Sequence, residues 1–460
     1  MRGESQPTVF LGLAQYSHYS DVLRGHLIRA LAPHYRLVVL TPLIDRAIAE
    51  RDGYLEHPNV SYEKLDLAHP KLWVISDKYL RVPLTRDLDH LTYMRYFYER
   101  PHWWPRKLLM RARILFPKKL FSVDRLTRWE VRLARPSSAF LGLVRRSRPA
   151  LLLTATPGFT PFEAELIVFA KRLGIPTAAV NINYDNLTSN GKLLRRTDYL
   201  AVWNEPMAQE ARELHGFSDR ELAVVGPLRF DHYFLDRDSQ ELLSREAFLR
   251  SKGLDPSRKT VVFAGPTPAN YPPRLEFLRE LLRLRREGAI RGSPNILVRL
   301  HPNDPHALYR EFAGEAGLAI ERAGRQTRSD AAGGQKIEMG EKDFLNLTAT
   351  LQYADVVLNF ASTVIMEACI FDRPVLNIAF PPYRRIVYEY EYNRGLVRTG
   401  GVKIASSPGE LALMVNRYLA NPALDRAERA HLLDTYLPFR DGKSYLRVAR
   451  FIERIVRPLE

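Results

Sequence analysis

The segment Ala354–Phe380 constrains the fold of this 460-residue chain more than any other stretch. An apolar run from Val356 to Phe360 predicts a buried strand, and Val375–Phe380 predicts the next one. Between them the chain breaks at Ala361-Ser362-Thr363 and continues as an apolar helix, which Pro374 ends. Because a strand, a helix and a strand in this order form a parallel crossover, we expect α/β architecture.

The start of this predicted helix carries side chains that suit a nucleotide. Ser362 and Thr363 stand where unpaired backbone N–H groups and the positive end of the helix dipole favour a phosphate. Glu367 lies about one turn further in, where its carboxylate can accept hydrogen bonds from two neighbouring sugar hydroxyls. The alternative is that Ser362 only caps the helix and that Glu367 is a solvated helix residue.

Two further strands end in residues of similar chemistry. The apolar run Asn295–Pro302 has Arg299 and His301 at its carboxyl end, where ligands bind in open α/β sheets. These two side chains share one face of an extended strand, so they form a basic pair that can neutralise a pyrophosphate. The run Val261–Pro268 ends in a small-residue loop with the hydroxyl of Thr267.

In this order, Pro266-Thr267, His301-Pro302 and the Ser-Thr-x-x-x-Glu of Ser362–Glu367 resemble the nucleotide-binding half of GT-B transferases. The resemblance is to CDP-glycerol glycerophosphotransferases of teichoic acid synthesis and to capsule polysaccharide transferases with a His-Pro motif. The last spacing also resembles the Ser-Gly-Gly-x-x-Glu of non-hydrolysing UDP-GlcNAc 2-epimerases, in which the acid holds the ribose. Here Thr363 and Val364 replace the two glycines, and Asn359-Phe360 stand where the teichoic enzymes have an acid. The nucleotide-binding residues that the resemblance implies are Thr267, Arg299, His301, Ser362, Thr363 and Glu367.

Alternating strands and helices in both halves of the chain predict more than one domain. We expect a Rossmann-like acceptor domain over 1–235 with a basic helical insertion at about 87–146, and a nucleotide-donor domain over 236–425. We expect the helices of 426–460 to return to the first domain. With the resemblance, this is the GT-B plan of two Rossmann-like, doubly wound domains facing across a cleft.

The amino-terminal half offers two candidates for a general base. His18 lies in the loop between the first strand and the first helix, and its unperturbed pKa is near working pH. Its alternative role is to pack in that loop, and His26 is a rival candidate. Asp185 lies in the hydrogen-bonding stretch Asn181–Asn190, where turn chemistry is the alternative.

The net charge of +16 is concentrated in residues 100–148, which hold fourteen lysines and arginines against Asp124 and Glu130. Within it, a row of arginines at helical spacing adjoins an apolar face of Leu126, Trp129 and Leu133. This pattern favours an interfacial helix on an anionic membrane, and the alternative is a core-facing stripe flanked by solvated arginines. Nucleic acid is not an expected partner, because no recognition motif accompanies the basic patch. The expected membrane-binding residues are Trp103, Trp104, Arg125, Arg128, Arg132 and Arg135.

A single cysteine, Cys369, allows no internal disulfide and suits a reducing cytosol. The chain lacks an apolar signal core, a membrane-spanning stretch, and a cluster of metal-ligating residues at a strand end, so we expect no metal or cofactor. Helix dipoles and basic side chains can stabilise a leaving nucleotide instead. We therefore expect a cytoplasmic protein held on the inner face of the cytoplasmic membrane.

The expected activity is transfer of a sugar or glycerol phosphate from a CDP-, CMP- or UDP-linked donor to a glycan or lipid-linked acceptor of the cell envelope. One alternative is an isomerase similar to the 2-epimerases. Another is a non-catalytic nucleotide-sugar or lipid-binding protein on the same fold.

Overall fold

The computed structural model describes residues 6–15, 18–19, 22, 26–51, 57–67, 84, 104–112, 115, 122–189, 191–193, 195–268, 271–322, 324–327, 336–381 and 391–457. The chain divides into two compact units. Unit 1 consists of Met1–Arg229 and Lys443–Glu460, and unit 2 consists of Phe230–Gly442.

Unit 1 is built on a parallel sheet of seven strands in the order β3-β2-β1-β4-β5-β6-β7. The order reverses beside β1, so the topological switch point lies between β1 and β4. The strands are β1 (Thr8–Gly12), β2 (Arg36–Thr41), β3 (Val60–Lys64), β4 (Pro149–Thr154), β5 (Thr177–Val180), β6 (Tyr199–Val202) and β7 (Leu222–Val224).

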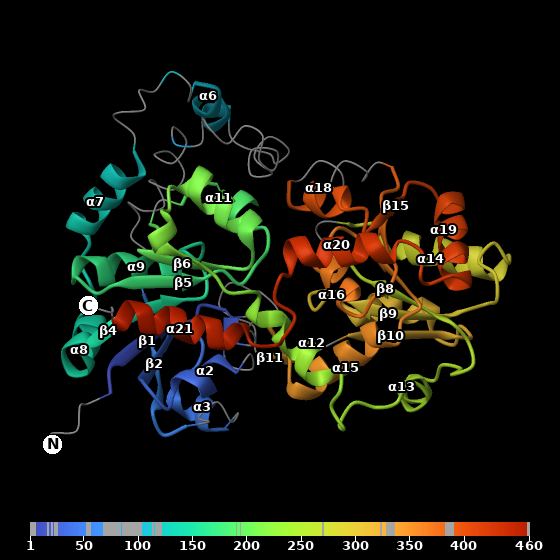
Figure 1. Cartoon of the computed structure of the whole chain (residues 1–460), viewed down its shortest axis with the longest axis horizontal. Helices are drawn as coiled ribbons and strands as arrows, with labels where there is room; N and C mark the ends of the chain where they lie inside the picture. The colour runs from blue at the N-terminus through green and yellow to red at the C-terminus, as the bar shows by residue number, and fades with distance from the viewer. Residues whose placement is uncertain are drawn as a thin grey trace. The chain divides into compact units, whose positions relative to one another are not determined.

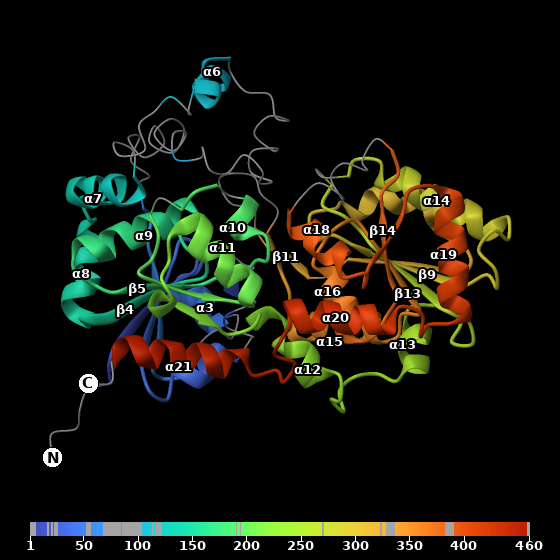
Figure 2. The same ribbon diagram turned by 45° about the horizontal axis from the view of Figure 1, so that its top comes forward.

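Helices cover both faces of this sheet, which is why its central strands are apolar on both sides. Val9 and Leu11 pack with α2 (Leu27–Leu31) and α21 (Ser444–Val456). Phe10, between them, packs on the opposite face with α8 (Ser138–Ser147) and α9 (Pro161–Arg172). Figures 1 and 2 show α21 and α9 on opposite sides of the sheet.

Unit 2 repeats the plan with six parallel strands in the order β10-β9-β8-β13-β14-β15. Its switch point therefore lies between β8 and β13. The strands are β8 (Thr260–Ala264), β9 (Asn295–Leu300), β10 (Leu318–Arg322), β13 (Val356–Asn359), β14 (Val375–Ile378) and β15 (Lys403–Ala405). The predicted doubly wound α/β architecture is confirmed in both units.

Helices also cover both faces of the unit 2 sheet (Figure 2). The core beside one face is shared by α14 (Arg274–Arg286) and α19 (Pro408–Ala420). On the other side α16 (Val364–Ile370) packs between α15 (Glu341–Gln352) and α20 (Arg426–Tyr436).

Three features of unit 2 differ from the sequence-based expectation. Strands β10 and β15 form the edges of the sheet and were not expected. Residues 325–338 contain the antiparallel pair β11 (Arg325–Thr327) and β12 (Lys336–Glu338), which was not expected either.

The helices of 426–460 do not all return to the first domain, because only α21 belongs to unit 1. Helix α20 stays in unit 2, where it packs on α16. The buried guanidinium of Arg429 on α20 donates to Asp372 and to the carbonyls of Leu424 and Pro422. Such a fully hydrogen-bonded buried charge ties the helix firmly to its own unit.

Among the described residues, no helix combines the length and apolar character needed to cross a bilayer.

Candidate functional site

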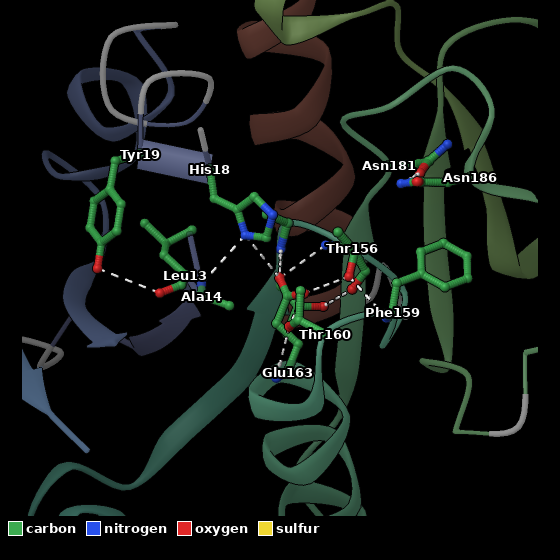
Figure 3. Close-up of polar contacts among 12 residues, drawn as sticks. Leu13, Ala14, His18, Tyr19, Thr156, Phe159, Thr160, Glu163, Asn181 and Asn186 are labelled. Atoms are coloured by element: carbon green, nitrogen blue, oxygen red, sulfur yellow. Dashed lines mark hydrogen bonds and ion pairs between the residues drawn. The ribbon is translucent and has the colours of Figure 1, made fainter. Parts of the chain in front are cut away.

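The loop after β1 and the first turn of α9, the helix that follows β4, bring a histidine and a glutamate together at the switch point of unit 1. His18 is 2% exposed, and its Nδ1 lies 3.4 Å from Oε1 of Glu163. The backbone N–H of Ala14 donates to the same Nδ1 over 3.4 Å. Figure 3 shows the imidazole ring pointing toward the glutamate. Ligands in open α/β sheets bind outside this end of the strands, so the pair stands where chemistry is expected.

Glu163 is fully buried, yet its carboxylate has four donors around it. The N–H groups of Ala155 and Thr156 each donate to Oε1 at 3.1 Å. The hydroxyls of Thr156 and Thr160 donate to Oε2 at 2.5 and 2.7 Å (Figure 3). These bonds compensate the buried carboxylate for the water that it loses and hold it rigidly.

This arrangement gives the two nitrogens of His18 different roles. A proton on Nδ1 can be donated to Glu163, which leaves the lone pair of Nε2 available as a base. If Nδ1 instead accepts from Ala14, the proton is on Nε2. Only the first tautomer, in which Nδ1–H is donated to Glu163, leaves Nε2 able to act as a general base.

Sequence reasoning missed Glu163, although a signal for it was present. Thr160 caps α9 by accepting from the N–H of Glu163, and Pro161 occupies the first turn. The pattern Thr-Pro-x-Glu after a buried strand is typical of a helix start that lies at the carboxyl edge of the sheet.

The second base candidate, Asp185, lies just before the short helix α10 (Asn186–Ser189). Its backbone carbonyl accepts from the N–H groups of Thr188 and Ser189. Burial raises the pKa of the Asp185 carboxyl, against smaller lowering effects of the Ser189 hydrogen bond and of Arg229. Its local contacts fit the turn role that the sequence left open.

In unit 2, the loops after β8 and β9 approach each other closely. A methyl group at Gly265, two residues before Thr267, would lie 3.2 Å from the carbonyl oxygen of Arg299 and 3.4 Å from the nitrogen of His301. The N–H of Gly265 also donates to that carbonyl at 2.8 Å. A side chain at this position would be tightly placed against the β9 backbone, and the approach brings Thr267 and His301 to neighbouring strand ends.

His301 is a neutral imidazole near pH 7 rather than the cation that the sequence predicts at this strand end. Its Nδ1 accepts from the N–H of Asn303 at 3.1 Å, so in the neutral ring the proton is on Nε2. Burial lowers the pKa of His301, and the nearby Asp304 only partly opposes this effect. His301 therefore offers a hydrogen-bond donor rather than a positive charge near pH 7.

The charge of Arg299 is also compensated within the protein. Its Nη1 donates to Glu321 at 2.8 Å, and Lys252 and Asn346 bind the same carboxylate. The reason is the unexpected strand β10, whose register sets Glu321 opposite Arg299. The predicted basic pair is therefore replaced by a neutral imidazole and a paired guanidinium, whose buried Nη2 has no hydrogen-bond partner among the described residues.

The turn before α16 is set by two buried asparagines at the ends of β13 and β14. Asn359 and the N–H of Ala361 both donate to Oδ1 of Asn377, and Ala361 has a left-handed backbone with φ of 51°. The exposed Ser362 donates to Asn359 at 2.7 Å. A non-glycine residue in this conformation stores strain, and such strain concentrates at functional sites.

Thr363 and Glu367, one helical turn apart, contact each other. The hydroxyl of Thr363 donates to Oε1 of Glu367 at 2.9 Å, and the hydroxyl of Tyr233 donates to Oε2. Glu367 is buried, so it is not the solvated residue of the alternative interpretation. Tyr233 was missed, because it lies 134 residues away from Glu367 in the chain.

The basic segment forms helices, and one of them presents apolar side chains outward. On α7 (Val123–Leu133), Trp129 is 44% and Leu133 50% exposed, beside exposed arginines. The inward residue is Glu130, whose carboxylate pairs with both Nε and Nη2 of buried Arg195 at 2.8 Å. Trp129 and Leu133 are therefore only partly covered by the rest of unit 1, whereas Leu126 is more buried.

The other expected membrane-binding residues differ in whether the structure describes them. Trp104 is exposed at the start of α6 (Trp104–Ala112), whereas Trp103 lies outside the described residues. The expected arginines on α7 and directly after it are all exposed, namely Arg125, Arg128, Arg132 and Arg135. Within the described part of the chain, no group of three or more His, Cys, Asp or Glu side chains is arranged to hold a metal ion.

No protein-family model and no curated protein matches the chain. Solved structures do match, over nearly the whole length. A UDP-GlcNAc 2-epimerase from Neisseria meningitidis bound to UDP-GlcNAc aligns with a TM-score of 0.57 and 10% identity, covering 97% of this chain and 100% of that one. The wall teichoic acid polymerase TagF with CDPG aligns with a TM-score of 0.53 and 11% identity, covering 99% and 90%.

A glycosyltransferase from Rickettsia africae aligns with a TM-score of 0.52 and 8% identity, covering 99% and 100%. At these identities the similarity concerns the fold. The chain has the α/β fold of GT-B-type proteins, as its motifs predicted, and this fold carries both transferases and epimerases.

Proposed function

We propose that the protein is a nucleotide-donor-dependent transferase, which moves a sugar or glycerol phosphate onto a glycan or lipid-linked acceptor of the cell envelope. Unit 2 binds the donor and unit 1 binds the acceptor. The observation that carries the proposal is the buried His18–Glu163 pair at the switch point of unit 1. A transferase needs a base that activates an acceptor hydroxyl, and an imidazole oriented by a carboxylate supplies one.

The donor nucleotide binds at the switch point of unit 2. Thr267 offers a hydroxyl to the phosphates, His301 donates through Nε2, and Glu367 receives the ribose. Ser362 and Thr363 donate their hydroxyls to Asn359 and Glu367 and so hold the turn at which the phosphates bind. The unpartnered Nη2 of Arg299 is one further donor. Because little free positive charge stands there, binding rests on directional hydrogen bonds, and such sites in low-dielectric surroundings stabilise developing negative charge.

In catalysis, Nε2 of His18 accepts the proton of the acceptor hydroxyl as its oxygen attacks the donor. Glu163 stabilises the resulting imidazolium through Nδ1–H, and its four donors keep it in place. The nucleotide leaves from unit 2. Asp185 is the second candidate for the base.

The proposed place of action is the inner face of the cytoplasmic membrane. The supporting observation is the outward face of α7, where Trp129 and Leu133 stand among exposed arginines. Lipid-linked acceptors are reached at such a surface.

A 2-epimerase activity is the second candidate, since several solved structures of the same fold carry that name. The two activities differ in what they consume. An epimerase changes a nucleotide-linked sugar without an acceptor and keeps the nucleotide attached, whereas a transferase releases the nucleotide only when an acceptor is present.

The test is therefore to incubate the pure protein with radiolabelled UDP- and CDP-linked donors, with and without a bacterial lipid extract. We expect acceptor-dependent release of nucleotide and transfer of label to the lipid or glycan fraction. His18→Gln should lower the rate on the order of 10²–10⁴-fold while donor binding by calorimetry is kept. Glu163→Gln should lower the rate less and shift its pH profile, because it acts through His18.

Conversion of the sugar with its nucleotide intact, in the absence of acceptor, would establish the epimerase instead. Full turnover in His18→Gln would move the base to another residue, and Asp185→Asn is then the next variant to assay.

A further inference from the structure

The carboxylate of Glu367 is held from two sides, and one of its partners belongs to none of the predicted motifs. Thr363 approaches Oε1 from the turn before α16. The hydroxyl of Tyr233, on α12 (Asp231–Asp236), donates to Oε2. Both Tyr233 and Glu367 are buried, so this contact is not a chance pairing at the surface.

Packing fixes the position of the Tyr233 hydroxyl. The ring of His232 lies 3.9 Å from that of Tyr233, and the ring of Phe371 meets it edge-on at 5.6 Å. Phe371 is the residue after α16, the helix that carries Glu367. The tyrosine therefore contacts both the carboxylate and the end of its helix, so its hydroxyl and Glu367 keep one relative geometry.

The hydrogen bonds from Thr363 and Tyr233 use only part of the acceptor capacity of the Glu367 carboxylate. An ionised carboxylate has about four lone-pair positions, two on each oxygen. Thr363 occupies one on Oε1 and Tyr233 one on Oε2. One position remains on each oxygen, and two such positions in one plane match the adjacent 2′- and 3′-hydroxyls of a ribose.

We propose that Tyr233 is a positioning residue that makes this site selective for ribonucleotides over 2′-deoxyribonucleotides. The inference rests on the proposed function, in which Glu367 receives the ribose of the donor. A deoxyribose leaves one of the two remaining positions on the buried carboxylate empty, and a buried acceptor without a donor lowers affinity. Without the Tyr233 hydroxyl the carboxylate is free to turn, so the distinction between the sugars weakens.

The test compares UDP and CDP with dUDP and dCDP by calorimetry on the full chain. For whichever base binds, we expect the wild type to prefer the ribonucleotide by ~10-fold or more, the effect of one hydrogen bond to a charged group. Tyr233→Phe should reduce this preference several-fold by weakening the ribonucleotide and sparing the deoxyribonucleotide. The ratio is measured within one protein, so it does not depend on the fraction that is folded.

Tyr418→Phe is the matched control. Tyr418 is another buried tyrosine of unit 2 that donates to a carboxylate, that of Asp425, at 2.7 Å. We expect its removal to leave the ribose preference unchanged. An equal fall in both variants would mean that the preference reports the general stability of unit 2, and would overturn the proposal.

Other outcomes separate this inference from the proposed function. If the wild type binds none of the four nucleotides and no CMP, the proposed function fails and this inference with it. If Glu367→Gln loses the ribose preference but Tyr233→Phe keeps it, only the role of Tyr233 is refuted. Should Tyr233→Phe not fold, Phe371→Leu keeps the hydroxyl but loosens the ring; an unchanged preference there counts equally against the proposal.

Discussion

At the residue scale, burial decides the chemistry of His301. Its ring is neutral near pH 7 because desolvation lowers its pKa below the ordinary 6.5, and Nδ1 is already used by the N–H of Asn303. The unfolded chain therefore binds a proton at a higher pH than the folded chain does. The contribution of this residue to stability is complete above about pH 6.5 and is lost as the pH falls toward the folded-state pKa.

Replacing His301 with asparagine should flatten this part of the pH dependence. Asparagine keeps an acceptor for the N–H of Asn303 but does not titrate, so the difference in unfolding free energy between about pH 7.5 and 5.5 should shrink. Urea unfolding at both pH values measures it. A variant whose pH dependence equals that of the wild type would show that His301 titrates normally.

The separation of contacting residues along the chain explains which site residues can be predicted from the sequence. Thr363 and Glu367 are one helical turn apart, so their meeting follows from local structure alone. Glu163 and Tyr233 contact their partners, His18 and Glu367, only through folding across long stretches of chain. No local pattern encodes such a pairing, although the capping pattern at Thr160 marked the place of Glu163.

Among the strands, register determines whether the charge of a predicted basic residue is compensated by a neighbouring strand. The strand of Arg299 was predicted, but its partner β10 is weakly apolar and was not. The register of that unpredicted strand places Glu321 opposite Arg299. The carboxylate of Glu321 therefore compensates the positive charge of Arg299, on which the predicted basic pair depended. Central strands with continuous apolar runs can be predicted from sequence, whereas edge strands need the pairing that only the folded sheet provides.

The buried ion pair that attaches α7 to unit 1 leads to a prediction about stability. Glu130→Ala leaves the buried guanidinium of Arg195 without its bidentate partner, which should destabilise unit 1 by about 3–5 kcal/mol. Glu50→Ala is the control, because its pair with Arg46 is exposed and such pairs contribute about 0–1 kcal/mol. Urea unfolding measures both. Equal, small effects would mean that α7 is held by its apolar contacts alone.

In the molecule as a whole, both units follow the same strand order. This repetition explains why the fold could be predicted. Each sheet has a switch point. His18 lies at that of unit 1, and the turn of Thr363 and Glu367 follows β13, one of the two strands at that of unit 2. The path of the last helices was harder to predict, because only their packing partners decide the unit to which each belongs. A buried arginine holds α20 in unit 2, and an apolar face joins α21 to unit 1.

The whole chain should also bind membranes reversibly through α7. Its exposed arginines attract anionic lipid by ~1 kcal/mol each within a Debye length, and Trp129 and Leu133 add an apolar contact that salt does not screen. We therefore expect flotation with anionic liposomes to exceed that with neutral ones and to weaken, without vanishing, as salt is added. Changing Arg125, Arg128, Arg132 and Arg135 to glutamate should abolish the anionic preference.

The control for this experiment reverses four exposed arginines of unit 2, namely Arg250, Arg286, Arg310 and Arg417. This variant carries the same change in net charge, so it should keep the anionic preference if the contact is local to α7. An equal loss in both variants would mean that the overall charge of +16, rather than the α7 surface, drives binding. Equal recovery of the wild type on neutral and anionic vesicles would instead leave the α7 arginines as solvated side chains, because a lipid contact through them requires the opposite charge on the membrane.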